Sequence, residues 1–414
     1  MLDAAAAQDR VVRRVIIPET PRGAQRSLVL SSVRNRGKTS HMARSAGRKY
    51  RILYLHPGQN IDTGSPKAMM CFIAALDRTM FEPVFLSDED GPLTGAFRAR
   101  GAGIVRGRGA SVSFRHPLDA FGAIRRQAIQ LKSWKIDLLH ANGFFWNTDV
   151  ILAAWMLRIP VILHVHNPAT VDSQNLVRFA ARKVLFCSRF EMGNTRHFNR
   201  IRDKADVFHN AIDTAAMGGG VSIRRGLGLK DGEVAVGTVA QVAHRKGMDI
   251  LIETARILLR ERRDLVFLIA GPVGTGEAEF GRSMHALAEE PELRGHVRFV
   301  GPRSDVPDFL ASLDLFLLPT RAEPFGIALI EAMAAGVPVI ASRVGGIPEI
   351  LSSPGIGRMV DPIAPDAFAT AVREMLALPD RGRSMAERAR LSVAQRFDIA
   401  PAGERLKKIY LDLL

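Results

Sequence analysis

Residues 319–340 read PTRAEPFGIALIEAMAAGVPVI, and this stretch determines how the rest of the chain is interpreted. From 326 to 336 the residues are apolar on every side, with the single exception of Glu331. A second carboxylate, Glu323, stands eight residues earlier. A lone ionised carboxylate inside an apolar helix is costly unless it is hydrogen-bonded or paired. Three explanations are open for Glu331: a structural ion pair, with Arg343 as the candidate, a local opening in the packing, or a ligand.

The residues around this stretch indicate the kind of ligand. The run 314–320 is typical of a buried strand, and a helix follows it. The first backbone N–H groups of a helix have no partner within it and favour an anion. Glu331 would lie about one to two turns into the helix, and Glu323 before its first turn. A nucleotide-sugar, with hydroxyls at both ends and phosphates between them, would meet both carboxylates. The free amides would be those of Phe325, Gly326 and Ile327.

The second half of the chain, 233–390, alternates short apolar runs with helical segments. This alternation is typical of a parallel sheet with helices on both faces. Its strand candidates are 234–240, 265–271, 296–301, 314–320, 337–342 and 356–361.

The first half, 49–213, shows the same alternation. Its strand candidates are 51–56, 83–87, 136–141, 160–166, 183–188 and 206–213. Between the halves, 214–232 contains three consecutive glycines and is interpreted as a linker. Residues 391–414 are expected to form a C-terminal helix that packs back toward the first domain. The predicted fold is α/β, with two doubly wound parallel-sheet (Rossmann-like) domains facing a central cleft, where ligands bind beyond the carboxyl ends of the strands.

Composition agrees with two globular domains. The chain has 414 residues, 47% of them apolar, which is enough for two packed cores. Cys71 and Cys187 lie far apart and lack disulfide or metal-ligand spacing, which favours a reducing compartment. The longest apolar runs, such as 150–157, are too short to cross a bilayer, and the N-terminus has no signal-peptide core. The expected location is the cytoplasm.

Basic residues are concentrated at the N-terminus. The formal net charge is +15, and residues 1–49 hold 11 Lys or Arg against 3 Asp or Glu. Residues 1–48 have little apolar periodicity, which predicts a mostly disordered segment that catalysis does not need. This segment would dock on anionic lipid or nucleic acid, or it would be a tail without a charged partner. A further alternative is a start codon placed too early, with Met42 as one candidate for the true start.

Residues 121–135 predict an amphipathic helix. Its apolar residues stand at 121, 124, 128 and 131, and basic residues lie on the other face. Such a helix packs on its own sheet or lies on an anionic membrane surface. Packing on its own sheet is the more common arrangement, and the positive charge of the chain slightly strengthens the case for the membrane, which would then be the inner face of the plasma membrane.

A turn with Gly64 joins the first strand to a helix. Ser65 is the expected N-cap of this helix, and Pro66 its first residue. The helix N-terminus would point at the exit of the strand, where it favours an anion. Turns of this kind are also common without any ligand.

Together these motifs resemble a known family. EPFGIALIEAMAAGVPVIAS resembles the E-x7-E signature of retaining, family-4-type glycosyltransferases with the GT-B fold (glycosyl transferases group 1). VGGIPEIL follows it, and FVGPRSDVPDFLASLDLFLLPT and GTVAQVAHRKG precede it, in the order of that family. The resemblance is specific over 234–362 and looser over 50–213. It does not include the first 48 residues.

The resemblance implies roles for several residues. Glu331 would accept hydrogen bonds from the ribose of the nucleotide, and Glu323 would hold hydroxyls of the transferred sugar. Lys246 would neutralise the diphosphate leaving group, where charge grows in the transition state. His166 would act near the reacting carbon, unless it is only a strand-end histidine. Further contacts to sugar and diphosphate would come from the amides of Phe325, Gly326 and Ile327 and from the loop of Gly64 and Ser65.

The chain departs from the family pattern at Gln241. Relatives often carry an arginine there, five residues before Lys246, as a second phosphate clamp. Glutamine donates hydrogen bonds but brings no charge. Arg245 would then share in stabilising the charge on the leaving group.

The sequence shows no metal-ligand cluster, in agreement with the metal independence of the family. The resemblance implies a retaining transferase without a cofactor that moves a sugar from a nucleotide diphosphate-sugar to a glycan or lipid-linked acceptor. Cell-surface polysaccharide or glycolipid synthesis would use such an enzyme. The alternatives are a GT-B sugar-nucleotide epimerase and a non-catalytic basic protein that binds membrane or nucleic acid. Nucleic acid is not the expected partner.

Overall fold

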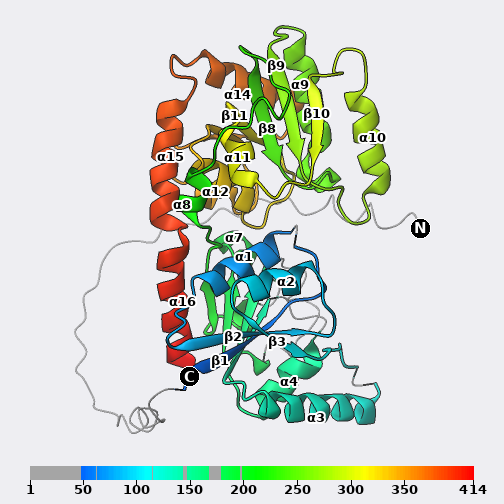
Figure 1. Ribbon diagram of the computed structural model, residues 1–414, viewed down its shortest axis with the longest axis vertical. Helices are drawn as coiled ribbons and strands as arrows, with labels where there is room; N and C mark the ends of the chain where they lie inside the picture. The colour runs from blue at the N-terminus through cyan, green and yellow to red at the C-terminus, as the bar shows by residue number, and fades with distance from the viewer. Residues whose placement is uncertain (1–47, 62, 114, 143–146, 167–178, 196–197) are drawn as a thin grey trace, which may run out of the picture. The chain divides into compact units, whose positions relative to one another are not determined.

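The computed structural model describes residues 48–61, 63–113, 115–142, 147–166, 179–195 and 198–414. The basic segment 1–48 therefore lies outside the described residues, apart from Arg48. Lys49–Leu414 form one unit that contains two parallel β-sheets (Figure 1). Among the described residues, no helix is both long and apolar enough to cross a bilayer.

The first sheet has the strand order β3-β2-β1-β4-β5-β6-β7, with every pair parallel. The sequence does not predict β3, because its four residues are only partly buried and form no apolar run. The strands are β1 Tyr50–Leu55, β2 Phe81–Ser87, β3 Gly103–Arg106, β4 Leu138–Asn142, β5 Val161–Val165, β6 Lys183–Phe186 and β7 Ala205–Val207. The helices of this half are α1 Gly64–Ala74, α2 Pro92–Ala99, α3 Pro117–Ser133, α4 Thr148–Met156 and α7 Arg189–Gly193.

The second sheet repeats this topology with the order β10-β9-β8-β11-β12-β13. Its strands are β8 Val234–Val239, β9 Leu265–Ala270, β10 Val297–Gly301, β11 Leu315–Leu318, β12 Val339–Ser342 and β13 Arg358–Val360. The helices that follow the first half are α8 Thr214–Gly218, α9 Met248–Leu259, α10 Ala278–Ala288, α11 Val306–Ala311, α12 Ile327–Ala334, α13 Ile347–Ile350, α14 Pro365–Ala377, α15 Arg383–Arg396 and α16 Ile399–Leu413.

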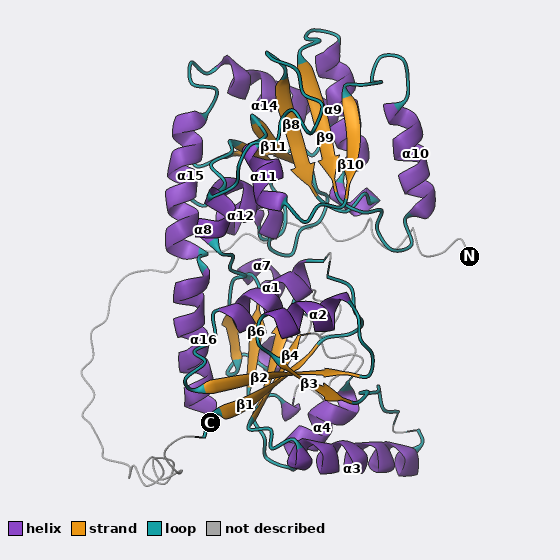
Figure 2. Cartoon of the chain, viewed as in Figure 1, coloured by secondary structure: helices purple, strands orange, loops and turns teal. Residues whose placement is uncertain are grey.

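Each sheet is covered by helices on both faces (Figure 2). Successive residues of a strand point to opposite faces, so each buried strand contributes to two cores. In β9, for example, Val266 and Leu268 belong to the core cluster on one face of the sheet, whereas Phe267 and Ile269 belong to the cluster that contains the buried residues of α9. This burial on both sides explains why the strands are continuous apolar runs in the sequence.

The chain after the first sheet is more ordered than a simple linker. Residues 214–232 contain the helix α8, and Leu227 and Leu229 are buried in the core of the second half. The predicted C-terminal helix 391–414 is instead parts of two helices, because α15 ends at Arg396 and Asp398 caps the start of α16.

Helix α16 packs on the first sheet, as the fold class predicts. The Tyr410 hydroxyl lies 2.9 Å from the Tyr54 hydroxyl in β1 and 2.6 Å from Nδ1 of His140 in β4. Gly403 permits close contact with α1, because a Cβ atom there would lie 2.7 Å from the carbonyl oxygen of Ala75. His140 is therefore a core residue under α16.

The buried face of helix α3 differs in part from the one that the sequence pattern predicts. Ala128 and Leu131 are buried and Ile124 is half-buried, as expected, but Phe121 is 63% exposed. Leu118 and Ile129 are also exposed, at 86% and 58%. With the basic Arg125 and Lys132 these three residues form one solvent-facing stripe along the helix, since they recur at intervals of three or four.

Candidate active site

The candidate site is built at the points where strand order reverses in the two sheets. These points lie between β1 and β4 in the first sheet and between β8 and β11 in the second. At such a point the loops after two neighbouring strands diverge and leave room for a ligand. Lys246 follows β8 and Glu323 follows β11, and Ser65 and Asn142 occupy the matching positions of the first sheet.

Lys246 and Glu323 are in direct contact. The Nζ atom of Lys246 lies 2.6 Å from Oε2 of Glu323, and their side chains are only 13% and 11% exposed. A partly buried pair of this kind is screened less by water than a surface pair. The two residues to which the sequence assigns the leaving group and the sugar therefore occupy one small volume.

The loop after β8 is fixed against the loop after β11. Gly247 has a φ of +68°, and a Cβ atom there would lie 1.9 Å from the carbonyl oxygen of Pro319. The hydroxyl of Thr320 donates to the carbonyl of Arg245 at 3.0 Å, and the Arg321 guanidinium binds the Asp249 carboxylate with two hydrogen bonds of 2.7 and 2.6 Å. These contacts hold Lys246 in place before any ligand arrives.

The glycine pair after β12 holds the backbone of Glu323. Gly345 has a φ of +58°, and a Cβ atom there would lie 1.8 Å from the carbonyl oxygen of Glu323. The N–H of Gly346 donates to the same carbonyl at 3.0 Å. The VGG motif is thus a support for the Glu323 loop.

Glu331 is buried and unpaired. It is 7% exposed, and its carboxylate has no ion pair or hydrogen bond with any residue that the structure describes. Burial raises the pKa of its carboxyl, an effect that the charge of Lys67 in α1 partly opposes. Arg343 is exposed and does not form the structural ion pair considered as the alternative explanation. The carboxylate therefore remains available to a ligand.

The start of α12 leaves its amides free as the sequence predicts. Gly326 is the N-cap with a φ of +117°, and the helix begins at Ile327. Within the described ranges, the backbone N–H groups of Phe325, Gly326 and Ile327 donate no hydrogen bond. They lie next to Glu323 in sequence and precede Glu331 by less than two turns.

The start of α1 approaches the start of α12. A Cβ atom on Gly64 would lie 3.4 Å from Cδ1 of Ile327. Ser65 is not the N-cap of α1, because that position is held by Thr63. The Ser65 hydroxyl instead accepts a hydrogen bond of 2.8 Å from the side chain of Asn142, whose amide also donates to the Ser65 carbonyl at 2.9 Å.

His166 joins this network. Its Nε2 atom lies 2.6 Å from Oδ1 of Asn142. The carbonyl of Ser65 can only accept, so Asn142 must turn its NH2 group to Ser65 and its oxygen to His166. Nε2 of His166 therefore carries the hydrogen. Burial, with the neighbouring His164 and His56, holds the pKa of His166 well below its usual range, so the ring is neutral and Nδ1 keeps its lone pair.

Gln241 and Arg245 are paired at the edge of the site. Nη2 of Arg245 donates to Oε1 of Gln241 at 3.0 Å, and Arg245 is exposed. Gln241, which stands where relatives often carry an arginine, thus contacts Arg245, the residue expected to help stabilise the leaving diphosphate.

Two residues of the site are not predicted from the sequence. Asn142 gives no local signal beyond its position at the end of a strand next to the point where strand order reverses. Glu191 in α7 is 2% exposed, and its Oε2 atom has no hydrogen-bond partner in the described part of the chain. Burial and the nearby charge of Glu323 raise the pKa of Glu191 to about 8. A neutral carboxyl therefore lies close to Glu323 at pH 7.

The loops of α7 and α12 are joined by hydrogen bonds. The Ser188 hydroxyl donates to the carbonyl of Pro324 at 2.7 Å. Glu349 accepts from the N–H groups of Arg189 and Phe190, both at 2.9 Å, and lies 3.0 Å from Nε2 of His209. Glu191 is thereby held near the Glu323 loop. Among the described residues, no group of three or more His, Cys, Asp or Glu could hold a metal ion.

The two sheets with this site define the chain as a GT-B glycosyltransferase, and solved structures of that class share its fold. HepE from Anabaena in complex with UDP-glucose superimposes with a TM-score of 0.72 over 88% of this chain and 100% of that chain, at 21% identity. The sequence matches the profile of glycosyl transferases group 1 over 222–392 and of glycosyltransferase family 4 over 67–216.

The curated relatives agree with these matches. The D-inositol 3-phosphate glycosyltransferase of Corynebacterium kroppenstedtii is 31% identical over 69% of each chain. The lipopolysaccharide core biosynthesis mannosyltransferase LpsB of Rhizobium meliloti is 34% identical over 31% of this chain and 37% of its own length. The chain belongs to the family-4-type, group 1 glycosyltransferases.

Proposed function

We propose that this glycosyltransferase moves a sugar from a nucleotide diphosphate-sugar to a glycan or lipid-linked acceptor with retention of the anomeric configuration. The observation that carries the proposal is Glu331, a buried carboxylate without a partner among the described residues, beside a helix start whose N–H groups donate to none of those residues. Ribose hydroxyls would supply the hydrogen bonds that the carboxylate lacks, and the diphosphate would lie at the helix start. UDP-glucose in the HepE structure supports this donor class.

The site residues divide the donor between them. Glu331 would hold the ribose, and Lys246 would leave Glu323 to bind the diphosphate, which frees Glu323 for hydroxyls of the transferred sugar. A preformed cation at the leaving group needs no reorganisation when charge develops there. The remaining donor contacts would come from the amides of Phe325, Gly326 and Ile327, from the pair Gln241 and Arg245, and from Gly64 and Ser65.

We propose a front-face reaction, in which the acceptor oxygen attacks from the side that the diphosphate leaves. The diphosphate itself takes the acceptor proton, so no protein nucleophile is needed. His166 is neutral, with its N–H held by Asn142, so its Nδ1 atom, which has no hydrogen-bond partner among the described residues, can accept a hydrogen bond from a sugar hydroxyl near the reacting carbon. Asn142 and Ser65 position this ring.

The acceptor would bind on the side of the first sheet, 49–213, and the product would be a cell-surface polysaccharide or a glycolipid. LpsB, by its name an enzyme of lipopolysaccharide core synthesis, supports the polysaccharide assignment. The cytoplasm, where nucleotide-sugars are available, is the proposed location.

A donor screen tests this function. With UDP-, GDP- and ADP-sugars offered in excess EDTA, we expect acceptor-dependent release of one nucleoside diphosphate, and a product whose anomeric configuration by NMR equals that of the donor. Loss of turnover in EDTA, restored by Mg²⁺ or Mn²⁺, would show that a metal is required. An inverted product would exclude the front-face mechanism.

We also propose that the enzyme contacts an anionic membrane through the α3 stripe, which consists of Leu118, Phe121, Arg125, Ile129 and Lys132. Large apolar side chains that are at least 58% exposed, with cations between them, are typical of a helix lying in the interface of an anionic bilayer. Membrane contact would bring a lipid-linked acceptor to the first sheet.

Vesicle sedimentation tests the α3 stripe. The wild type is expected to bind vesicles that contain anionic phosphatidylglycerol more strongly than neutral phosphatidylcholine vesicles. The double variant Phe121→Ser/Ile129→Ser should partition about tenfold less, because burying such side chains contributes about 1.5–3 kcal/mol each when complete. Leu391→Ser, which removes a half-exposed leucine from α15, is the matched control and should bind as the wild type does. Equal binding by all three proteins would refute the assignment.

A further inference from the structure

A cavity of about 760 Å³ opens at the carboxyl ends of β1, β2 and β3. Three loops and the start of one helix line it, and all of them lie in the first half of the chain, 49–213, which contains the first sheet. They are the β1–α1 loop at His56–Gln59, the end of β2 with the loop that follows it at 85–89, the β3–α3 loop at 107–111, and Asn147 at the N-cap of α4. In an α/β sheet this edge is where ligands bind, and none of the donor residues described above lines the cavity.

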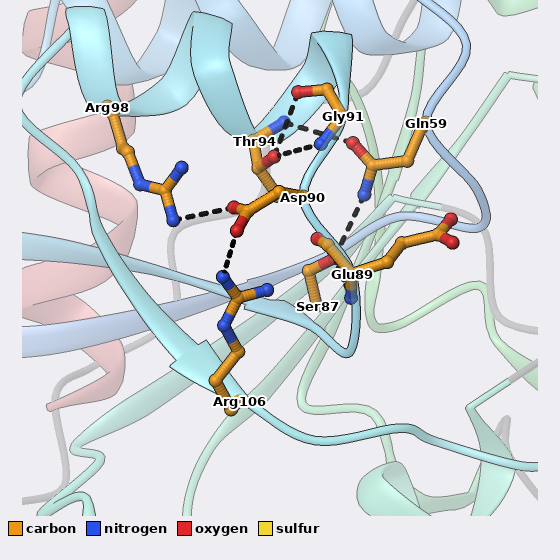
Figure 3. A network of polar contacts seen from close by, with 8 residues as sticks. All are labelled: Gln59, Ser87, Glu89, Asp90, Gly91, Thr94, Arg98 and Arg106. Carbon is orange, nitrogen blue, oxygen red and sulfur yellow. Dashed lines mark hydrogen bonds and ion pairs between the residues drawn. The ribbon is translucent and has the colours of Figure 1, made fainter.

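The walls of this cavity are held by a polar network (Figure 3). Gln59 joins two loops, because its Nε2 atom donates to the Ser87 hydroxyl at 2.9 Å and its Oε1 atom accepts from the N–H of Thr94 at 3.1 Å. Asp90 joins α2 to β3 through Arg98 at 2.7 Å and Arg106 at 2.5 Å. A site whose walls are fixed in advance loses little entropy when a ligand binds.

Asn147 also lines this cavity. The residue is 8% exposed, and its side chain forms no hydrogen bond with the part of the chain that the structure describes. Gly109 allows this position, because a Cβ atom there would lie 2.1 Å from Oδ1 of Asn147. An amide offers both a donor and an acceptor, which is the pairing that a sugar hydroxyl requires.

The charged groups of the cavity are mostly acidic. Asp88 and Glu89 line it, and the single cation that lines it among the described residues is Arg108, whose side chain is 84% exposed and lies 3.6 Å from Asp88. Burial lowers the pKa of His56 to about 4, so its ring is neutral at pH 7. A phosphate group, with a charge of about −1.5 to −2 at pH 7, would face two carboxylates and one already paired guanidinium.

The cavity is close to the reacting end of the candidate site. Its residue His56 follows β1, in the same loop that leads to Gly64 and Ser65. His56 is also near enough to His166 that a proton on His56 would lower the pKa of His166. A sugar in the cavity therefore has a short path to the acceptor side of the donor.

We propose that this cavity binds an uncharged, hydroxyl-rich sugar at the end of the acceptor, and that it discriminates against phosphorylated acceptors. This inference rests on the proposed function, because it names the acceptor class of the same enzyme. Asn147 would bind a sugar hydroxyl through both atoms of its amide, and Asp88 and Glu89 would accept hydrogen bonds from further hydroxyls.

Binding without a donor tests the inference separately from catalysis. The probes are mannotriose and its 6-phosphate derivative, measured against the full-length protein by calorimetry or saturation-transfer NMR. Mannotriose is expected to bind at least about tenfold more tightly than the phosphorylated sugar. Binding of mannotriose without turnover for any donor would overturn the transferase mechanism and leave the cavity assignment intact. Equal or tighter binding of the phosphorylated sugar would overturn the cavity assignment alone.

Four variants locate the binding to this cavity. Asn147→Ala should weaken mannotriose binding about tenfold, and Gly109→Ala should do the same by displacing the amide without removing it. Asp88→Asn/Glu89→Gln should reduce the preference for the uncharged sugar about tenfold. Glu279→Gln, an exposed carboxylate in α10, is the control and should leave both affinities unchanged. Wild-type affinities in the first three variants would exclude the cavity as the binding site.

Discussion

Replacing Lys246 with alanine is expected to lower kcat about 100- to 1000-fold, the usual cost of losing one preformed group that stabilises transition-state charge. The donor KM should change much less, because the charge on the leaving diphosphate is greatest in the transition state. Lys246→Arg keeps the charge and should recover part of the rate. Lys408→Ala, an exposed lysine in α16, should retain full activity.

The contact between Lys246 and Glu323 offers a different explanation, in which Lys246 only neutralises a partly buried carboxylate. Lys246→Met/Glu323→Gln distinguishes the two explanations. Removing both charges leaves no unpaired ion, so the double variant should be about as stable as the wild type. If Lys246 acts on the leaving group, kcat of the double variant falls well below that of Glu323→Gln alone. A kcat equal to that of Glu323→Gln, together with a wild-type melting temperature, would reduce Lys246 to a structural role.

Substitutions of the two glutamates of the E-x7-E motif are expected to change different kinetic constants. Glu331→Gln should raise the donor KM more than it lowers kcat, because ribose contacts are equally strong before and during reaction. Glu323→Gln should lower kcat about tenfold or more, if one charged hydrogen bond of about 1.5–3 kcal/mol is weakened. Calorimetry with the nucleoside diphosphate that the donor screen identifies separates them, since affinity should fall for Glu331→Gln alone. Wild-type affinity in Glu331→Gln would refute the ribose contact.

Glu331→Gln should also change the pH dependence of stability. Because burial raises the pKa of Glu331, the folded protein holds this proton more strongly than the unfolded chain does. Its contribution to stability is complete below the unfolded pKa of about 4.3 and is lost as pH rises through the folded value. The variant should therefore melt at a higher temperature than the wild type at pH 8, and the difference should vanish near pH 4. A difference in melting temperature that is the same at pH 8 and pH 4 would contradict a raised pKa of Glu331 in the folded protein.

The donor half of the site was predictable because its signals are local. Glu331 is conspicuous as a lone charge among apolar residues, and the glycine before it marks a helix start. Lys246 and Glu323 each follow a strand, and parallel strands end at the same edge of their sheet. Their 2.6 Å contact follows from this topology once β8 and β11 are neighbours.

Other predictions failed where a residue's role depends on distant neighbours. Ser65 looks like a helix cap, but its hydroxyl binds Asn142, 77 residues later in the chain. Phe121 fits the apolar side of α3, but the helix is rotated so that this ring faces solvent. β3 was missed because an edge strand is half-buried and needs no apolar run.

The sequence by itself determined the two α/β halves and the order of most of their strands along the chain, and it predicted Glu323, Glu331 and Lys246 as candidate site residues. These features depend on the periodicity of apolar residues, on glycines at turns and helix starts, and on isolated charges, and each of these signals extends over only a few residues. Only the tertiary structure decided that Asn142 orients His166, that Glu191 lies near Glu323, and that Asn147 lines an acidic cavity. Each of these facts depends on burial and on partners brought together by the sheet topology, and no local pattern records which distant segments will meet.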